Sequence, residues 1–214
     1  EDVDGDGWQE LAIGAPGAGS SAGKLAGAGA VYAAASSGDL WRMLEGKAAG
    51  DRLGEALAAA GDTNADGTPD VLAGAPGATR GFAEAGEVVL AGFDGTRLWA
   101  RTGREAGERY GAALAVVARS PEGAADELLV GAPGSSAGGV PKGGRGELVS
   151  GDGRELASIA GTTKGAGLGG FVAAGPDLDG DGRKELVLVE PATWADGETL
   201  GLSHFYRRND LPKP

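Results

Sequence analysis

Four copies of one short pattern limit what this chain can fold into. The first copy, DVDGDGWQELAIGAPG at residues 2–17, has acidic residues at alternate positions, then glycine, a short apolar run and Gly-Ala-Pro-Gly. Related stretches begin at residues 62, 119 and 177, so the copies are spaced by 60, 57 and 58 residues. Self-similarity at such a period is typical of repeat architectures, in which each repeat is one supersecondary unit. We therefore expect four similar units.

The acidic part of the first copy has the spacing of a cation-binding loop. Asp2, Asp4, Asp6 and Glu10 stand at loop positions 1, 3, 5 and 9, and the carbonyl of Trp8 can point inward at position 7. Calcium suits such a set, because it accepts about six to eight oxygen ligands in a flexible geometry, whereas magnesium demands a tighter octahedron. An EF-hand is not favoured, because that loop needs a glutamate at position 12. A solvated surface turn would explain one isolated copy, but the recurrence favours an ion-binding loop.

Composition and charge exclude several classes of protein. The 43 glycines and 10 prolines recur at fixed places in the repeats, so they are expected to mark turns and not disorder. A formal net charge of -12 argues against partners such as nucleic acid or anionic membranes. The chain has no cysteine, hence no disulfide framework, and no apolar run of about 18 residues that would insert into a membrane.

Each repeat is expected to contain up to four short strands separated by glycine-rich turns. The expected strands are 11–13, 28–34 and 40–44; 57–60, 71–73, 87–91 and 97–101; 112–118, 127–130, 146–149 and 155–159; and 171–174, 185–189 and 200–206. A helix over the alanine-rich residues 54–61 is the alternative there, but the equivalent stretches in later repeats contain valine and glycine. Four short strands per repeat are typical of a propeller blade.

Two glycine-containing elements accompany the loops at constant offsets. A Gly-Ala-Pro element stands at residues 14–16, 74–76 and 131–133, and a weakened Phe-Gly element at residues 53–54, 110–111 and 168–169. With these elements the sequence resembles the FG-GAP repeats of integrin-alpha-type β-propellers. A Leu-Trp pair after a turn, at residues 40–41 and 98–99, is similar to the outer strand of bacterial members. The resemblance covers nearly the whole chain.

The resemblance implies an all-β fold, a β-propeller of four-stranded antiparallel blades within residues 1–214. The repeats would span about 1–50, 51–106, 107–164 and 165–214. Propellers of the integrin type have seven blades, and this chain has about four. The first repeat lacks its innermost strand and the last its outermost. We expect either part of a longer propeller, in line with a chain that opens on Glu1 without methionine, or a ring completed by a second copy.

The resemblance also implies Ca2+ at three of the four loops. The three expected sites are Asp2, Asp4, Asp6, the Trp8 carbonyl and Glu10; Asp62, Asn64, Asp66, the Thr68 carbonyl and Asp70; and Asp177, Asp179, Asp181, the Arg183 carbonyl and Glu185. The third repeat departs from the pattern, because Arg119, Pro121 and Gly123 occupy its ligand positions. No metal is expected there.

The groups that most enzymes use are scarce in this chain. The one histidine, His204, lies in the strand-like run SHFY, where a packed or surface histidine is the simpler interpretation. Trp41 and Trp99 recur at equivalent places, which favours blade packing over sugar stacking. We therefore expect no enzyme but an extracellular or cell-surface calcium-binding propeller, secreted, that binds a protein or glycan ligand in adhesion. The alternative is an accessory portion of a secreted hydrolase or lyase.

Overall fold

The computed structural model describes residues 7–119, 126–193, 199–207 and 210–211. These residues form an all-β structure with 46% strand and a single short 3-10 turn, η1 (Ala137–Gly139). Their strands group into four antiparallel sheets, one for each repeat, in which neighbours in the chain are neighbours in the sheet.

The sheets have three or four strands each. The first contains β1 (Leu11–Ala15), β2 (Ala30–Ala34) and β3 (Leu40–Glu45); the second β4 (Ala56–Gly61), β5 (Asp70–Ala75), β6 (Glu87–Gly92) and β7 (Arg97–Thr102); the third β8 (Ala113–Arg119), β9 (Asp126–Ala132), β10 (Arg145–Ser150) and β11 (Glu155–Ala160); the fourth β12 (Phe171–Ala174), β13 (Leu186–Thr193) and β14 (Thr199–Tyr206). All the expected strands are confirmed within a few residues. The alanine-rich segment is strand β4 and not a helix.

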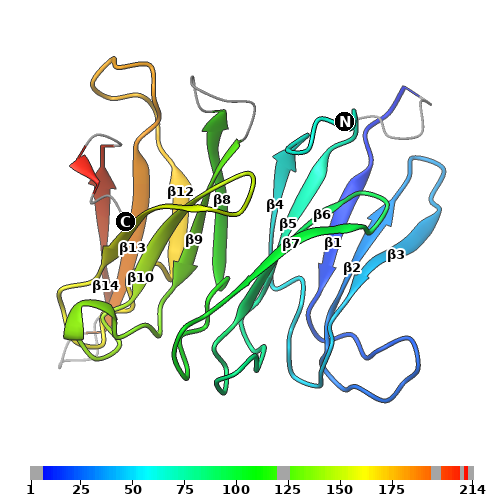
Figure 1. Ribbon diagram of the computed structural model, residues 1–214, viewed down its shortest axis with the longest axis horizontal. Helices are drawn as coiled ribbons and strands as arrows, with labels where there is room; N and C mark the ends of the chain where they lie inside the picture. The colour runs from blue at the N-terminus through cyan, green and yellow to red at the C-terminus, as the bar shows by residue number, and fades with distance from the viewer. Residues whose placement is uncertain (1–6, 120–125, 194–198, 208–209, 212–214) are drawn as a thin grey trace.

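The four sheets stand side by side in chain order, with the first and the last at opposite ends of the row (Figure 1). Their first strands bring them together, since β4 contacts both β1 and β8, and β8 contacts β12. β1 is an edge strand of the first sheet, as expected for a blade without its innermost strand. This arrangement is that of successive propeller blades.

The core lies between the sheets. One apolar cluster, with Val31 and Val89, joins the first and second sheets, a second, with Leu90 and Leu128, joins the second and third, and a third cluster joins the third and fourth. Every residue of β5, β6 and β10 is buried, because sheets or loops cover both faces of these strands. That is why β5 and β6, after their first residue, read as continuous apolar or small residues, whereas β10 also contains the buried ion-paired residues Arg145 and Glu147.

Glycine permits very close contact between successive repeats. A Cβ atom at Gly74, in the Gly-Ala-Pro element, would lie 2.1 Å from the carbonyl oxygen of Gly111, in the Phe-Gly element of the next repeat. Gly14 and Gly131 make the same approach to Gly54 and Gly169. In the fourth sheet, the residue in the equivalent register is Val189, which pairs with Phe171. The two motifs of the family resemblance therefore meet at each junction between repeats.

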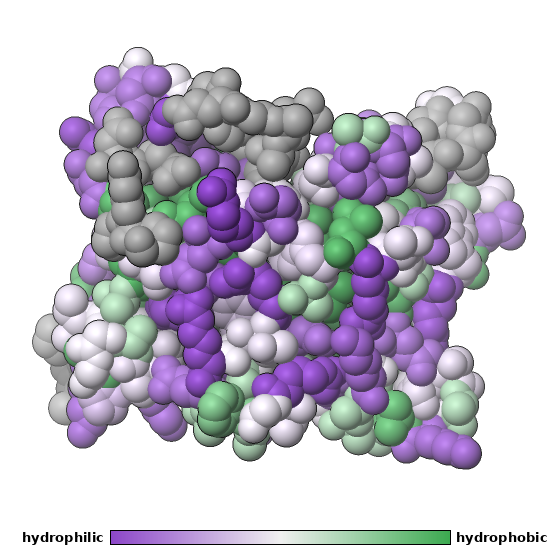
Figure 2. Space-filling view, in the orientation of Figure 1, coloured by the Kyte–Doolittle hydropathy of each residue, from purple (hydrophilic) through white to green (hydrophobic). Residues whose placement is uncertain are grey.

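The viewed surface is mostly hydrophilic, and long polar side chains cross it between the sheets (Figure 2). No helix among the described residues has the length and apolar character needed to span a membrane.

Candidate metal centres

The candidate ion loops lie at one end of the sheets, the upper end in Figure 1, where β4 leads into β5 and β12 into β13. These two loops contain the residues that are expected to bind an ion in the second and fourth repeats. In the first loop, Asp2, Asp4 and Asp6 lie outside the described residues, while Trp8 is exposed and Glu10 is buried. In the third repeat, Pro121 and Gly123 and the side chain of Arg119 also lie outside the described part.

The loop of the fourth repeat brings its acidic side chains together. Asp177, Asp179 and Glu185 each offer a carboxylate oxygen within 4.8 Å of the other two. The carboxylate of Asp181 accepts a hydrogen bond from the backbone N–H of Arg183 at 2.9 Å, so position 5 is also held in the loop. Three converging carboxylates are the hard oxygen donors that calcium prefers.

Backbone hydrogen bonds fix the conformation of this loop. Asp177 accepts from Gly180 N–H at 2.7 Å and from Gly182 N–H at 2.9 Å. The Oε2 atom of Glu185 accepts from Leu178 N–H at 2.8 Å, which ties the start of the loop to the strand that follows it. The acids therefore approach one another because the loop folds around their side chains.

The loop of the second repeat has the same hydrogen-bond plan. Asp62 accepts from the N–H groups of Asp66 and Gly67, at 3.0 and 2.9 Å, and the bond from Gly67 corresponds to that from Gly182 to Asp177. Asp70 Oδ2 accepts from Thr63 N–H at 2.8 Å, in the place of Glu185. Among the described residues, however, the three acids of this loop do not reach the mutual spacing seen in the fourth repeat. Position 3, which is Asp179 in the fourth repeat, is Asn64 here, so one of the three converging acids has no counterpart in this loop.

The remaining polar groups of the second loop form a compact turn. Asp66 accepts from the backbone N–H of Thr68 at 2.8 Å and from the side-chain amide of Asn64 at 2.7 Å. The hydrogen bond from the Thr68 hydroxyl, with these two, lowers the pKa of Asp66. This carboxylate is therefore ionised well into the acid range, as a cation ligand must be.

The acid at loop position 9 is buried in all three candidate loops. Glu10, Asp70 and Glu185 are each less than a tenth exposed, whereas Glu127, at this position in the third repeat, is half-buried. Asp70 is fully buried, and its Oδ1 atom has no hydrogen-bond partner among the described residues. An ionised carboxylate oxygen is costly to bury without a partner. The donor set and this orphaned oxygen both fit a bound cation.

One feature near the candidate centres was not predicted from the sequence. The Nε atom of Arg207 lies 3.5 Å from Asp179 Oδ2, so a cationic side chain borders the fourth loop. No local sequence pattern predicts this contact, because Arg207 and Asp179 are far apart along the chain. His204 stacks on Tyr206 with ring centroids 6.1 Å apart, in agreement with a packed histidine.

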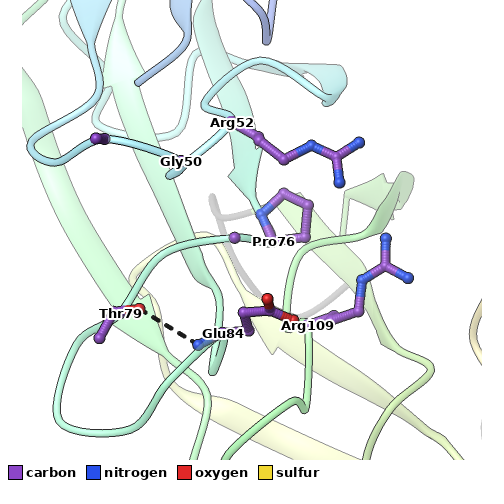
Figure 3. Close-up of a pocket in the computed structure, with 8 residues that line it drawn as sticks. Gly50, Arg52, Pro76, Thr79, Glu84 and Arg109 are labelled. Atoms are coloured by element: carbon purple, nitrogen blue, oxygen red, sulfur yellow. Dashed lines mark hydrogen bonds between the residues drawn. The ribbon is translucent and has the colours of Figure 1, made fainter. Parts of the chain in front are cut away.

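A cavity of about 470 Å3 lies at the opposite end of the sheets, among the loops that join successive repeats. Two arginines, Arg52 and Arg109, line it (Figure 3). This cavity was not predicted from the sequence, although a signal of it was present. An arginine precedes the Phe-Gly element in two repeats, in the runs DRLG and ERYG.

Comparison with known proteins identifies the repeat. A family model described as the FG-GAP repeat matches residues 1–33 and 53–90, which reach from the first loop into β2 and from the Phe-Gly element into β6. No curated protein matches the chain. FG-GAP repeats form β-propellers that are commonly extracellular, adhesion-type and non-catalytic modules, and they are known to bind calcium. The match covers two of the four repeats and, together with the four blade-like sheets, supports an FG-GAP repeat family for this chain.

Proposed function

We propose that this chain is a calcium-stabilised propeller module that acts outside the cell by binding a protein or glycan ligand, and not by catalysis. The observation that carries the proposal is the buried acid at loop position 9, above all the unpartnered Oδ1 atom of Asp70. A cation at each loop would neutralise this acid and join the loop to the strand that follows.

Three loops would hold the ions. In the fourth repeat the ligands are Asp177, Asp179, Asp181 and Glu185 with the carbonyl of Arg183; in the second, Asp62, Asn64, Asp66 and Asp70 with the carbonyl of Thr68; in the first, Asp2, Asp4, Asp6 and Glu10 with the carbonyl of Trp8. Bound calcium supplies positive charge that lets neighbouring carboxylates approach without repulsion. The fourth repeat is expected to bind most tightly, because its carboxylates already converge.

We further propose that the four repeats form one domain, residues 1–214, and one arc of a propeller. The arc would be completed by additional blades or by a second copy, since in the described part of the chain β1 is an edge strand.

Calcium titration of the purified chain tests the metal proposal. Calorimetry should detect binding, and calcium should raise the melting temperature relative to excess EDTA, because a ligand that binds only the folded state stabilises it. Glu185→Gln keeps an acceptor for Leu178 N–H but removes the charge. It should weaken the site of the fourth repeat by about tenfold or more, while stability in EDTA stays equal or rises, since a buried charge is gone.

Glu190→Gln is the matched control. Glu190 is also buried on β13, where its carboxylate lies 3.5 Å from His204 Nε2 and away from the loop. This variant should retain all calcium binding. Melting curves that are identical in calcium and in EDTA for the unmodified chain would overturn the proposal.

A further inference from the structure

The cavity at the end opposite the ion loops lies where three repeats meet. Arg52 comes from the turn between β3 and β4, Thr79 and Glu84 come from the connection between β5 and β6, and Arg109 comes from the turn between β7 and β8. Pro76, with Gly77 and the backbone at Ala49 and Gly50, completes the lining. Figure 3 shows the two arginine side chains extending to the same side, one on each side of Pro76.

Both arginines occupy a backbone conformation that favours glycine. Their φ angles are +61° at Arg52 and +58° at Arg109, in the left-handed region. The equivalent residue at the next junction is Gly167, with φ +67°, because each of the three precedes a residue that bridges to the preceding repeat. Glycine adopts this conformation without steric conflict, whereas arginine does so at a conformational cost. The fold alone therefore does not explain arginine at two of these three places.

The two guanidinium groups have few anionic partners. Both lie beside the same carboxylate, with Arg52 Nε 2.7 Å from Glu55 Oε2 and Arg109 Nη2 3.7 Å from Glu55 Oε1. Their side chains are 50% and 44% exposed. By contrast, Arg145 is buried between Glu108 and Glu147. Each guanidinium therefore keeps N–H donors that are not used in these contacts, and Glu84 is the one acidic residue among the described residues that line the cavity itself.

We propose that this cavity binds an acidic sugar, through the carboxylate of a uronic acid residue placed between Arg52 and Arg109. Guanidinium groups donate paired, charge-assisted hydrogen bonds to a carboxylate, which are stronger than neutral ones. The volume of about 470 Å3 lies within the range of small-ligand sites. This inference names a ligand class for the binding role in the proposed function and rests on that role, although it does not depend on calcium.

The other groups at the cavity favour a sugar over an acidic peptide. Glu84, also left-handed with φ +48°, brings a carboxylate to the cavity, where it would repel a polyanionic peptide but accept hydrogen bonds from sugar hydroxyls. The Thr79 hydroxyl accepts a hydrogen bond from Glu84 N–H at 3.3 Å, and its own hydrogen remains to donate.

Titration with a trisaccharide that carries a single glucuronic acid residue, followed by calorimetry and by NMR of the backbone amides, tests the proposal. Binding should be saturable, should weaken with salt, and should shift amides around residues 50, 77, 79 and 109. A carboxyl-reduced trisaccharide, which is neutral, should bind at least about tenfold more weakly because the charge-assisted hydrogen bonds are lost. Equal binding of the neutral sugar, no binding of the acidic one, or equal binding of an oligo-aspartate peptide would each overturn the proposal.

Glycine substitutions separate binding from folding. Arg52→Gly and Arg109→Gly copy the residue that the chain has at 167, so the urea midpoint should stay close to that of the unmodified chain while affinity falls about tenfold or more. Lys142→Gly is the control, because Lys142 is an exposed left-handed cation (φ +50°) in the next repeat and does not line the cavity. It should leave affinity unchanged, and equal loss in all three variants would indicate non-specific charge attraction and overturn the site.

Calcium titration of the same sample keeps the two proposals apart. Sugar binding without calcium binding would overturn the metal proposal alone. Calcium binding without sugar binding would overturn the cavity proposal alone.

Discussion

Successive repeats pack closely because glycine, which has no Cβ atom, stands where their backbones meet. Gly74 lies so near the carbonyl of Gly111 that a Cβ atom would be 2.1 Å from its oxygen. We expect Gly74→Ala to lower the free energy of unfolding by roughly 2 kcal/mol or more, because the obstacle is backbone and the core would have to shift. Urea unfolding measures the change.

Gly17→Ala is the control for this substitution. Gly17 ends the first Gly-Ala-Pro-Gly run, and nothing lies within 4 Å of a Cβ atom built there. Its substitution should change the free energy of unfolding by no more than about 0.5 kcal/mol. Similar small effects at both glycines would mean that the repeats do not pack through the Gly74 contact.

For single residues, the sequence predicted which side chains can bind an ion better than it predicted how deeply they are buried. The acids of the candidate loops were identified because their spacing recurs, and Asp177, Asp179 and Glu185 do come together. The complete burial of Asp70 could not be predicted, since it depends on packing against a neighbouring sheet. The left-handed backbone of Arg52 and Arg109 could not be predicted either, because arginine rarely adopts this conformation and its presence in the sequence does not indicate it.

Between elements, a buried network of charges joins the second and third sheets. Arg101 on β7 donates to Glu147 on β10, and Arg145 on β10 donates to Glu147 and to Glu108. Tyr110 is enclosed beneath this network, with its hydroxyl 3.3 Å from Arg101 Nε and its ring 5.5 Å from the guanidinium carbon of Arg145. Burial raises the pKa of Tyr110 above its ordinary value of 10.0.

This burial predicts a loss of stability in alkaline solution. Above pH 10 the unfolded chain releases the Tyr110 proton while the folded chain retains it, so the free energy of unfolding falls as pH rises further. The slope from this group approaches about 1.4 kcal/mol per pH unit. Urea unfolding between pH 9 and 11 should show the fall, and Tyr110→Phe should reduce it. A variant with the same fall would show that the phenol is not protected from ionisation.

The elements themselves were largely predictable, and their partners were not. Short apolar runs between glycine turns located every strand, and the repeat resolved the ambiguity between helix and strand at β4. The network joins residues such as Arg101 and Glu147, which are 46 positions apart. Such pairs form only when one sheet packs against another, and no local sequence pattern predicts which residues then meet.

For the whole molecule, the first sheet presents a free apolar face. Leu11 and Ile13 alternate on β1 and are 65% and 44% exposed, and Leu40 on β3 is 59% exposed. Since β1 is also an edge strand among the described residues, we expect the chain to self-associate with defined stoichiometry, as the acidic surface opposes non-specific clumping. Light scattering should report a mass above that of one chain, and Leu11→Lys with Ile13→Lys should return it to the monomer.

Phe82→Lys serves as the control for this test, because Phe82 is similarly exposed but lies on a connection between β5 and β6. It should leave the measured mass unchanged. A stable monomer for the unmodified chain would contradict the expectation and indicate that the first sheet tolerates its open edge.

Val189 makes the fourth sheet different from the three sheets before it. At Gly14, Gly74 and Gly131 the absence of a side chain admits the backbone of the following repeat, but at the equivalent place in the fourth sheet a branched side chain fills that space, next to an exposed Phe171. A further repeat cannot seat itself there by the contact used three times before. Whatever packs on the fourth sheet, an additional blade or a second copy, must therefore approach it with a differently shaped backbone.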